Sequence, residues 1–495
     1  MDAAGAEARA RSVLLGLGFS QESIDQPVSR LSGGWKTRCS LASSLCQPAD
    51  LLLLDEPTNF LDLPSIIWLE HYIQNLDPSV TVLAVTHDRA FADSIANELL
   101  VMRNQSLERF RGNLSTYELE REKKYKYLSR MKDAQDKQKK HIEKSIDQNV
   151  KAAKKTGDDK KLKQAASRKK KLDERWGMEV SAKGGKFKLN RDLAGYHYSN
   201  RDAIEVPEFD PPTKMALPTE VTDLRFPGAL VAFEKVSFAY KKQTPVLRDI
   251  SLTIHQGERV GLAGMNGSGK SSLVSLAIGG ADESSASLKP TSGSVTRHTR
   301  ARFGLYSQQA AEELDALAAE KPEMTALSHL MECDSSQTEQ EARGLLSGVG
   351  LAGRAASDVP VKLLSGGQKV RLALAKIFLT PPHLLILDEV TTHLDTDTID
   401  ALIGALRNYE GAILVVTHDR FFMRCVVEGE SPKQIARAYR PDADEESEES
   451  ESGDEVAERE RTVHRLSKGK LTKLSGGMLQ YEELAEKASA KLGKV

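Results

Sequence analysis

The fold is decided by the stretch LSGGWKTRCSLASSLCQPADLLLLDEPTNFLD, residues 31–62, because the chain contains it twice. The second copy, at residues 364–395, is LSGGQKVRLALAKIFLTPPHLLILDEVTTHLD, with the same spacing throughout. Further along, AVTHDRAF at 84–91 matches VVTHDRFF at 415–422. Self-similarity on this scale marks a duplicated structural unit. The sequence therefore predicts two copies of one domain.

The two copies differ in what precedes the shared stretch. In the second copy a long segment comes first, with a strand-rich start at 231–240 and the glycine-rich run GMNGSGKS at 264–271. In the first copy the shared stretch follows residues 1–30, too short a segment for an equivalent. We therefore expect a single phosphate-binding loop. A shortened sequence and a naturally stripped domain are both compatible with this difference.

The run at 264–271 matches the phosphate-binding pattern GxxxxGK[ST]. It follows the apolar segment ERVGLAG and precedes the helix-like SSLVSLAI, which is the strand–loop–helix context that the motif requires. Glycines let backbone N–H groups turn toward phosphates, and the following helix adds a positive dipole. Lys270 would reach the β- and γ-phosphates, and the Ser271 hydroxyl would ligate Mg²⁺. A chance glycine-rich turn would not have this context.

A second motif is the apolar run HLLILDE at 383–389, which ends in two carboxylates. Ligands of α/β sheets bind at the C-terminal ends of strands, so these acids are expected beside the phosphate-binding loop. Asp388 would hold Mg²⁺ through water, and Glu389 would polarise the attacking water as a general base. Taken alone, the run could also be a strand that ends in solvated acids.

The composition excludes several classes. Its 40% hydrophobic and 28% charged residues fit a globular protein rather than a disordered or fibrous one. The sequence contains no apolar run of the roughly 18 residues that a membrane span needs, and its first residues lack the apolar core of a signal peptide. The four cysteines are scattered, which indicates reduced thiols in a cytoplasmic protein. Nuclear residence is also compatible, because the basic cluster at 168–171 is too generic to decide.

The segments between and within the copies have a different character. Residues 1–117 form the C-terminal part of the first domain, and residues 118–205 a basic linker whose Lys- and Arg-rich sequence predicts two long helices turned near 155–159. A Pro-rich connector follows at 206–228, and the second domain spans 229–495. An acidic insert at about 441–460 cannot bury enough apolar surface to fold, so we expect disorder there.

The phosphate-binding loop, LSGGQ, the apolar run ending in DE and the downstream THD resemble the ABC ATPases. The two-copy layout with a basic linker, DEPTNFLD and DEVTTHLD is similar to the ABC-F subfamily. This resemblance implies an α/β fold of ABC-type P-loop NTPase domains, one partial and one complete, joined by a basic α-helical hairpin. The second copy departs from the family's pattern at Val390 and Thr392, where Pro and Asn are usual. These positions shape the loop after Glu389 without removing a catalytic group.

The resemblance also implies that the P-loop of one domain faces the LSGG segment of the other. The catalytic residues would then be Glu389, His418 and Gln308, and the Mg²⁺ ligands Ser271, Gln308 and Asp388. Tyr240 would stack on adenine, and the alternative is that it is an ordinary aromatic residue of a strand. For His418 the alternative is a capping or core histidine. The ATP-binding residues would be Tyr240, Gly264, Asn266, Gly267, Ser268, Gly269, Lys270, Ser271, Ser272, Ser32, Gly33 and Gly34.

A second site would lack its phosphate-binding loop. Its remaining residues are carboxylates, a histidine and the second LSGG segment, and without the lysine of a P-loop we expect no ATP there. These remnants are Asp55, Glu56, His87, Ser365, Gly366 and Gly367.

The predicted activity is Mg²⁺-dependent hydrolysis of ATP to ADP and phosphate at one composite site. The resemblance implies a ribosome, a ribosomal precursor, or ribosomal or transfer RNA as the partner, contacted through residues 118–175; charge alone fits a solvated hairpin equally well. A non-hydrolysing scaffold is the alternative function. The ATPase subunit of a transporter is less compatible with fused copies that have no membrane span. Oligomeric state and the step of translation or ribosome assembly stay open.

Overall fold

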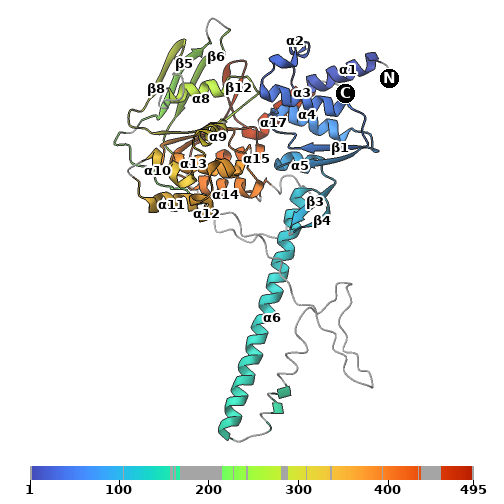
Figure 1. Cartoon of the computed structure of the whole chain (residues 1–495), viewed down its shortest axis with the longest axis vertical. Helices are drawn as coiled ribbons and strands as arrows, with labels where there is room; N and C mark the ends of the chain where they lie inside the picture. Colours follow the sequence, from blue (N-terminus) through green and yellow to red (C-terminus); the bar gives the residue numbers. More distant parts are fainter. Residues whose placement is uncertain are drawn as a thin grey trace. The chain divides into compact units, whose positions relative to one another are not determined.

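The computed structural model separates the chain into two compact units, Met1–Asn97 with Pro212–Val495 and Glu98–Pro211. We describe each unit by itself (Figure 1). The residues that the structure describes are 3–103, 105–156, 160, 163–164, 166–167, 215–226, 228–240, 244–279, 288–307, 309–334, 337–392, 394–432, 434–435 and 459–492.

The first unit has two halves, the first half Met1–Asn97 and the second half Pro212–Val495. The second half contains a six-stranded sheet with the order β13-β12-β7-β11-β10-β9. All neighbours are parallel except β12 and β13. A three-stranded antiparallel sheet with the order β6-β5-β8 lies beside it. The strands are β5 Val231–Phe238, β6 Leu247–Ile254, β7 Arg259–Gly264, β8 Ser292–Arg297, β9 Phe303–Tyr306, β10 Leu384–Asp388, β11 Ala412–Val416, β12 Arg461–Ser467 and β13 Lys470–Leu474.

Helices cover both faces of this sheet, so its central strands are buried throughout, as expected of a parallel sheet. One apolar cluster joins the sheet to α8 and the antiparallel strands, and another joins it to helices such as α13 and α14. The helices are α8 Lys270–Ile278, α9 Ala310–Glu320, α10 Ala326–Cys333, α11 Glu339–Gly348, α12 Arg354–Ser357, 3₁₀ helix η2 Val361–Leu363, α13 Gly366–Phe378, α14 Thr396–Arg407, α15 Arg420–Met423, π-helix η3 Arg424–Glu428 and α17 Gly477–Ser489.

The first half of this unit repeats part of that plan. Its two strands β1 and β2 are parallel, and they pair Leu51 with Thr81 as β10 and β11 pair Leu384 with Ala412. A third apolar cluster lies between these strands and their helices. The elements are α1 Ala3–Gly16, α2 Gln21–Ile24, 3₁₀ helix η1 Val28–Arg30, α3 Gly33–Cys46, β1 Leu51–Asp55, α4 Leu63–Gln74, β2 Thr81–Val85 and α5 Arg89–Ile95.

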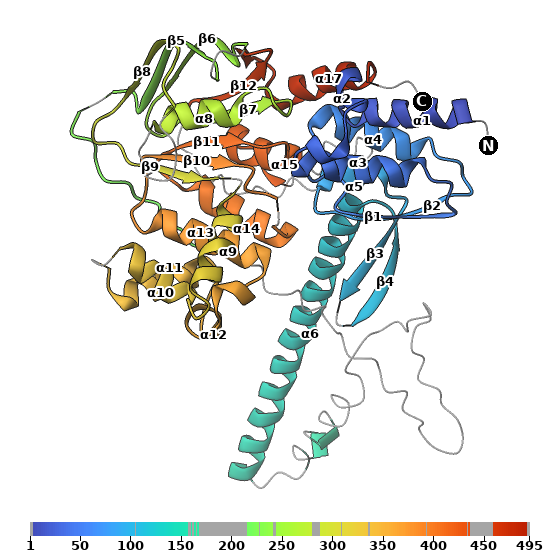
Figure 2. The same cartoon turned by 45° about the horizontal axis from the view of Figure 1, so that its top comes forward.

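The two halves of the first unit pack against each other. Helix α17 at the end of the chain lies along α4 from the first half, and Figure 2 shows the two together. Arg420 Nη2 lies 2.6 Å from Glu70 Oε1, with both side chains buried. Arg89 Nη2 lies 2.8 Å from Asp400 Oδ2. These pairs join segments far apart in sequence, so the repeats form one packed body.

The second unit contains the antiparallel hairpin of β3 Glu98–Arg103 and β4 Ser106–Arg111, followed by helix α6 Leu114–Thr156. Asn113 begins α6 by accepting a hydrogen bond from the Thr116 N–H at 3.0 Å. In the second half, β12, β13 and α17 repeat this hairpin–helix order, as the similarity of RGNLSTY and SGGMLQY indicates. The helix has 43 residues and confirms the first arm of the predicted hairpin.

Parts of three predicted segments lie outside the described residues: most of the second arm, connector residues 206–214 and acidic residues 441–458. Connector residues 215–226 contain neither helix nor strand, and Met215 and Leu217 are buried in the apolar cluster around α13. The connector is thus packed onto the second half where it is described. Among the described residues, no helix combines the length and the apolar character of a membrane span. The predicted domain limits remain predictions.

Candidate functional site

The glycine-rich run is a loop between β7, which ends at Gly264, and α8, which begins at Lys270. Gly267 and Gly269 have φ values of +76° and +105°, which L-residues rarely adopt. A Cβ at position 269 would also lie 2.9 Å from Val246 Cγ1. Both the conformation and the space therefore require glycine, and the loop closes on the N-terminus of a helix, where backbone N–H groups favour an anion.

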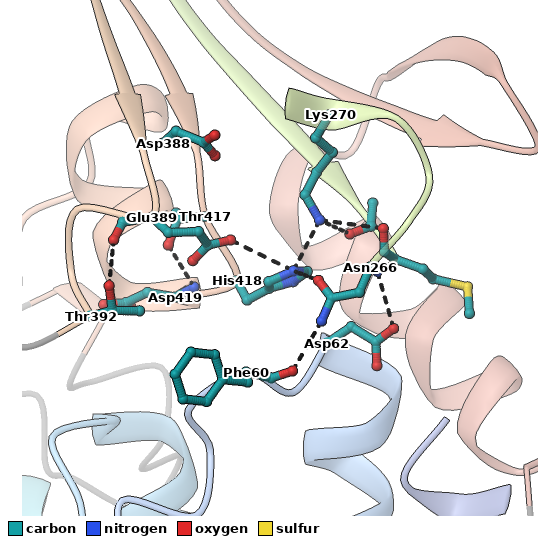
Figure 3. A network of polar contacts seen from close by, with 12 residues as sticks. Phe60, Asp62, Asn266, Lys270, Asp388, Glu389, Thr392, Thr417, His418 and Asp419 are labelled. Atoms are coloured by element: carbon teal, nitrogen blue, oxygen red, sulfur yellow. Dashed lines mark hydrogen bonds and ion pairs between the residues drawn. The ribbon is translucent and has the colours of Figure 1, made fainter. Parts of the chain in front are cut away.

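The Lys270 side chain is buried in this loop, with 8% of its surface exposed. Its Nζ lies 2.7 Å from the Gly264 carbonyl oxygen, 3.3 Å from that of Met265 and 3.0 Å from His418 Nε2 (Figure 3). Burial lowers the pKa of Lys270, whereas the Glu389 carboxylate and two aspartates oppose this shift. The lysine thus lies at the centre of the loop, held by exchangeable hydrogen bonds.

The two carboxylates come from the end of β10. Asp388 accepts a hydrogen bond from the Ser271 hydroxyl at 3.3 Å, so the predicted Mg²⁺ ligands are adjacent. Glu389 follows with a φ of +54°, and the Thr392 hydroxyl donates to its carbonyl oxygen at 2.7 Å. Burial raises the pKa of Glu389 to about 7, although the Lys270 ammonium opposes the shift. A carboxyl group that titrates near neutrality can exchange protons with water under physiological conditions.

His418 reaches the same place from the loop after β11. Its Nε2 is 3.1 Å from Asn266 Oδ1 and 3.7 Å from Glu389 Oε1. Its pKa lies well below the usual value because of burial, with the charges of Lys270 and Arg38 adding to the effect. The neighbouring Asp419 begins α15 by accepting from the Phe422 N–H at 2.9 Å. The imidazole is therefore neutral and held in place by a capped helix.

Residues of the first half complete the site. Ser32 is the N-cap residue of α3, which begins at Gly33. Ser32, Gly33 and Gly34 line a cavity of about 1040 Å³ together with the P-loop. The Asn266 N–H donates to Asp62 Oδ2 at 3.3 Å, and Asn266 Nδ2 donates to the Phe60 carbonyl oxygen at 3.0 Å. The predicted assembly of two halves around one cavity is the arrangement that the structure has.

Other predicted residues fall in different places. Tyr240 and Ser272 line the cavity, and their hydroxyl groups are 2.9 Å apart. The Tyr240 side chain is partly exposed, and its ring packs edge-on against Phe238. The roles of adenine platform and ordinary strand aromatic are both compatible with this geometry. Gln308 lies outside the described residues.

Only some of the second-site remnants line the cavity. Glu56 and His87, 3.6 Å apart, line the same cavity as Lys270. Asp55 ends β1, and Ser365 begins α13 by accepting from the Gln368 N–H at 3.3 Å. The described lining of the cavity does not include Ser365, Gly366 or Gly367.

The sequence analysis assigned no roles to Phe60 and Asp62, which contact the P-loop at Asn266, or to Arg38, which donates to the Phe60 carbonyl oxygen. Asp62 ends the repeated DEPTNFLD segment, so the repeat was a usable signal for it. Phe60 acts through its backbone carbonyl, for which the sequence has no signal.

This fold and this cavity define an ATP-binding cassette protein: the ABC transporter family matches residues 4–59 and 247–392. A second match, also described as ABC transporter, covers residues 100–188, which include most of the basic linker. With that linker and relatives named as sub-family F, the chain belongs to the ABC-F subfamily of ABC ATPases.

Its relatives include "Probable ATP-binding protein YheS" of Haemophilus influenzae, 37% identical over 86% of this chain and 60% of that protein. "Protein GCN20" of Saccharomyces cerevisiae is 35% identical over 85% of this chain and 49% of that protein. "ATP-binding cassette sub-family F member 3" of Mus musculus is 33% identical over 86% of this chain and 53% of that protein. The chain therefore spans about half to three fifths of the length of these relatives.

Among solved structures, the "RNase-L Inhibitor" resembles the chain with a TM-score of 0.52 and 17% identity, over 98% of this chain and 72% of the other. A complex titled with the archaeal ribosomal stalk protein aP1 and the archaeal ribosome recycling factor aABCE1 matches with the same TM-score and identity, over 98% of this chain and 71% of that chain. These likenesses show the fold, which is α/β with ABC-type domains.

Proposed function

We propose that this chain binds ATP with Mg²⁺ in the cavity between its two halves and hydrolyses it to ADP and phosphate. The observation that carries the proposal is the composition of that cavity. It combines a P-loop, a carboxylate that titrates near neutrality and a neutral histidine from the second half with the LSGG segment of the first. Each is a group that phosphoryl transfer to water requires.

The residues present fit a nucleotide and its metal ion. Ser268 Oγ is buried without a hydrogen-bond partner among the described residues, at a place where a phosphate oxygen would accept from it. The Lys270 ammonium can exchange the loop carbonyls for phosphate oxygens. The Ser271 hydroxyl and the Asp388 carboxylate supply the oxygen ligands that Mg²⁺ prefers.

Each side chain then has a defined task. Glu389, whose turn is held by the Thr392 hydroxyl, accepts the proton of the attacking water. His418 orients the terminal phosphate, and Lys270 binds it. Mg²⁺ held by Ser271 and Asp388 would neutralise phosphate charge as a Lewis acid. Ser32, Gly33 and Gly34 donate from the first half, so the site is complete when the halves are closed.

Ribosomes or ribosomal precursors are the proposed partner, contacted through the basic linker. Membership of the ABC-F subfamily supports this, as does the charge of α6. Exposed cations recur along the whole helix and suit contacts with phosphates. They are Arg121, Lys123, Lys124, Lys126, Arg130, Lys132, Lys137, Lys140, Lys144 and Lys151. Cytoplasmic residence belongs to the same proposal.

The nucleotide proposal is tested by equilibrium binding of ATP to the full chain, with stoichiometry. We expect one ATP per chain for the wild type and loss of binding for Lys270→Ala. Lys362→Ala, which changes an exposed lysine outside the cavity, is the matched control. Binding without any turnover would instead favour an ATP-dependent scaffold, and a stoichiometry of two would contradict the single site.

The partner proposal is tested by co-sedimentation with purified ribosomes over a range of salt concentrations. Replacing Lys123, Lys124 and Lys132 with glutamine should weaken binding and flatten its salt dependence, by about one unit of slope for each lost phosphate contact. The same change at Lys468, Lys470 and Lys473, which are exposed on and beside β13, is the control. Equal binding by both triple variants would overturn the role of the linker.

A further inference from the structure

The carbonyl oxygen of Phe60 accepts hydrogen bonds from both halves of the first unit. Arg38 donates from the first half, with Nε at 3.0 Å and Nη2 at 2.5 Å, and Asn266 Nδ2 donates from the second at 3.0 Å. Phe60 itself has a φ of +66°, a left-handed conformation that is unusual and costly for an aromatic residue. Tertiary contacts must therefore help to hold it there, and the three hydrogen bonds to its carbonyl oxygen are among these contacts.

Arg38 is a rigid donor. Its side chain is 3% exposed, and its Nη1 also donates to the Leu17 carbonyl oxygen at 3.0 Å. The guanidinium lies over the Trp35 ring at 4.5 Å, and that ring packs edge-on against Phe19. Stacking together with the forked hydrogen bonds fixes the plane of the guanidinium. The position of the Phe60 carbonyl is fixed in consequence.

A fixed carbonyl decides the orientation of the Asn266 amide. Because the Phe60 oxygen can only accept, it selects the NH₂ end of the amide and leaves Oδ1 facing His418. An amide oxygen can also only accept. Its contact with His418 Nε2 at 3.1 Å therefore requires the imidazole hydrogen on Nε2.

Lys270 competes for the same nitrogen. Its Nζ lies 3.0 Å from His418 Nε2, and an ammonium can only donate, so this contact requires the hydrogen on Nδ1 instead. His418 Nδ1 is buried without a hydrogen-bond partner in the described part of the chain. A hydrogen placed there would be an unpaired buried donor, which is costly. The neutral imidazole carries one hydrogen on its two nitrogens. The hydrogen bond with Asn266 Oδ1 favours placing that hydrogen on Nε2.

We propose that Arg38 is a positioning residue that fixes the Nε2–H tautomer of His418 through the Phe60 carbonyl and the Asn266 amide. In this tautomer the histidine presents a donor to the cavity, as an anionic phosphate requires. That consequence rests on the proposed function, whereas the tautomer itself does not. Through this chain of contacts, closure of the first half onto the second prepares a histidine of the second half.

The internal repeat supplies a matched control. Arg371 in α13 occupies the position in LSGGQKVR that Arg38 occupies in LSGGWKTR. Its Nη2 contacts the Thr398 hydroxyl and lies 3.8 Å from Asp395 Oδ1, and it is absent from the described lining of the cavity. Arg371→Gln therefore changes the equivalent arginine without touching the network at Phe60.

The test is ¹⁵N NMR of the histidine side chains in the full chain without nucleotide. In the wild type the His418 Nε2 resonance should lie at the protonated position, and Arg38→Gln should move it toward the unprotonated one. Arg371→Gln should leave it in place. An unchanged resonance in Arg38→Gln, or an equal shift in both variants, would overturn the proposal.

A second variant and a second measurement complete the test. If Arg38→Gln does not fold, Arg38→Lys retains the charge but not the fork, and should shift the resonance part of the way. ATP turnover is measured in parallel, with an expected loss in kcat of at least about tenfold for Arg38→Gln and little change in nucleotide Kd, since a wrong histidine tautomer impairs catalysis severely in other enzymes. If the wild type turns over no ATP while the resonance responds as expected, the proposed function fails and the positioning role stands.

Discussion

Strands β1 and β10 have nearly the same sequence, and they pair with β2 and β11 in the same parallel register, but their surroundings differ. In β10 and β11 every residue is buried. In β1 one face is buried and in β2 the same face is half-buried, whereas the other face exposes Leu51, Leu53, Leu83 and Val85. In the second half the equivalent positions pack in one cluster with α8 and the antiparallel strands.

The comparison separates what the local sequence determines from what packing determines. Both halves make the same turn after the strand, since Glu56 has a φ of +45° and Glu389 one of +54°. Burial raises the pKa of both glutamates. The group that most lowers the pKa of Glu389 is the P-loop Lys270, whereas the group that most lowers the pKa of Glu56 is His87. The same backbone turn and the same acid therefore have different electrostatic surroundings in the two halves.

The largest expected effect is on ATP turnover, when Glu389 or Glu56 is replaced by glutamine. Glu389→Gln removes the proton acceptor and should reduce ATP turnover by a factor of about 10²–10⁴, while bound ATP becomes trapped. Glu56→Gln should reduce turnover much less, because Glu56 lines the same cavity but Lys270 acts on the electrostatics of Glu389 and is not among the groups that act on Glu56. Single-turnover hydrolysis with labelled ATP measures both. A comparable loss in the two variants would show that the halves are catalytically equivalent after all.

The next effect concerns the two strand faces. Ile386→Ala removes a fully buried side chain and should lower the free energy of unfolding by about 3 kcal/mol. Leu53, at the equivalent position of β1, is 64% exposed, so Leu53→Ala should change it by less than about 0.5 kcal/mol. Urea denaturation of the full chain gives both values. If Leu53→Ala were as costly as Ile386→Ala, another body would have to cover the face of β1.

The smallest effect concerns the aspartates that cap α5 and α15, Asp88 and Asp419. Burial, with Asp88 adding repulsion, raises the pKa of Asp419 to about 6 from 3.8. The folded chain then holds this proton more tightly than the unfolded one, so the free energy of unfolding falls as the pH rises from about 4 to about 6. Asp419→Asn keeps the cap and should remove this loss, a gain of at most about 3 kcal/mol near neutral pH.

Thermal unfolding across that pH range is the measurement for the capping pair. Asp88→Asn is the matched control: it removes one source of repulsion, so the loss of stability with rising pH should become smaller without disappearing. A profile for Asp419→Asn that coincides with the wild type at every pH would contradict the assignment.

Much of this architecture could be predicted from the repeat and the P-loop motif. Strand–loop–helix order and the acids after β10 follow from patterns that the chain itself contains, whereas the placement of Ser32 in one cavity with Lys270 was implied by the resemblance to ABC ATPases. Other features depend on tertiary contacts. The backbone carbonyl of Phe60 has no signature in a sequence, and Glu56 enters the main cavity because α4 and α17 pack the halves together.

The burial of the strands could not be predicted from the sequence either. LLLLD and LLILD are almost identical, but exposure depends on whether a helix such as α8 covers them. The charge of the linker predicted the first arm of the hairpin, because a long polar segment without proline or glycine favours a continuous helix.

Helix α6 has a mechanical consequence. At about 1.5 Å per residue, its 43 residues form a rod about 65 Å long. Rotation at one end of a rod is converted into displacement at the other, here about 1 Å for each degree of tilt at Leu114. A tilt of about ten degrees would carry Thr156 through roughly 11 Å, the full width of an α-helix with its side chains. A small change of angle at Leu114 would therefore become a displacement of many ångströms at Thr156.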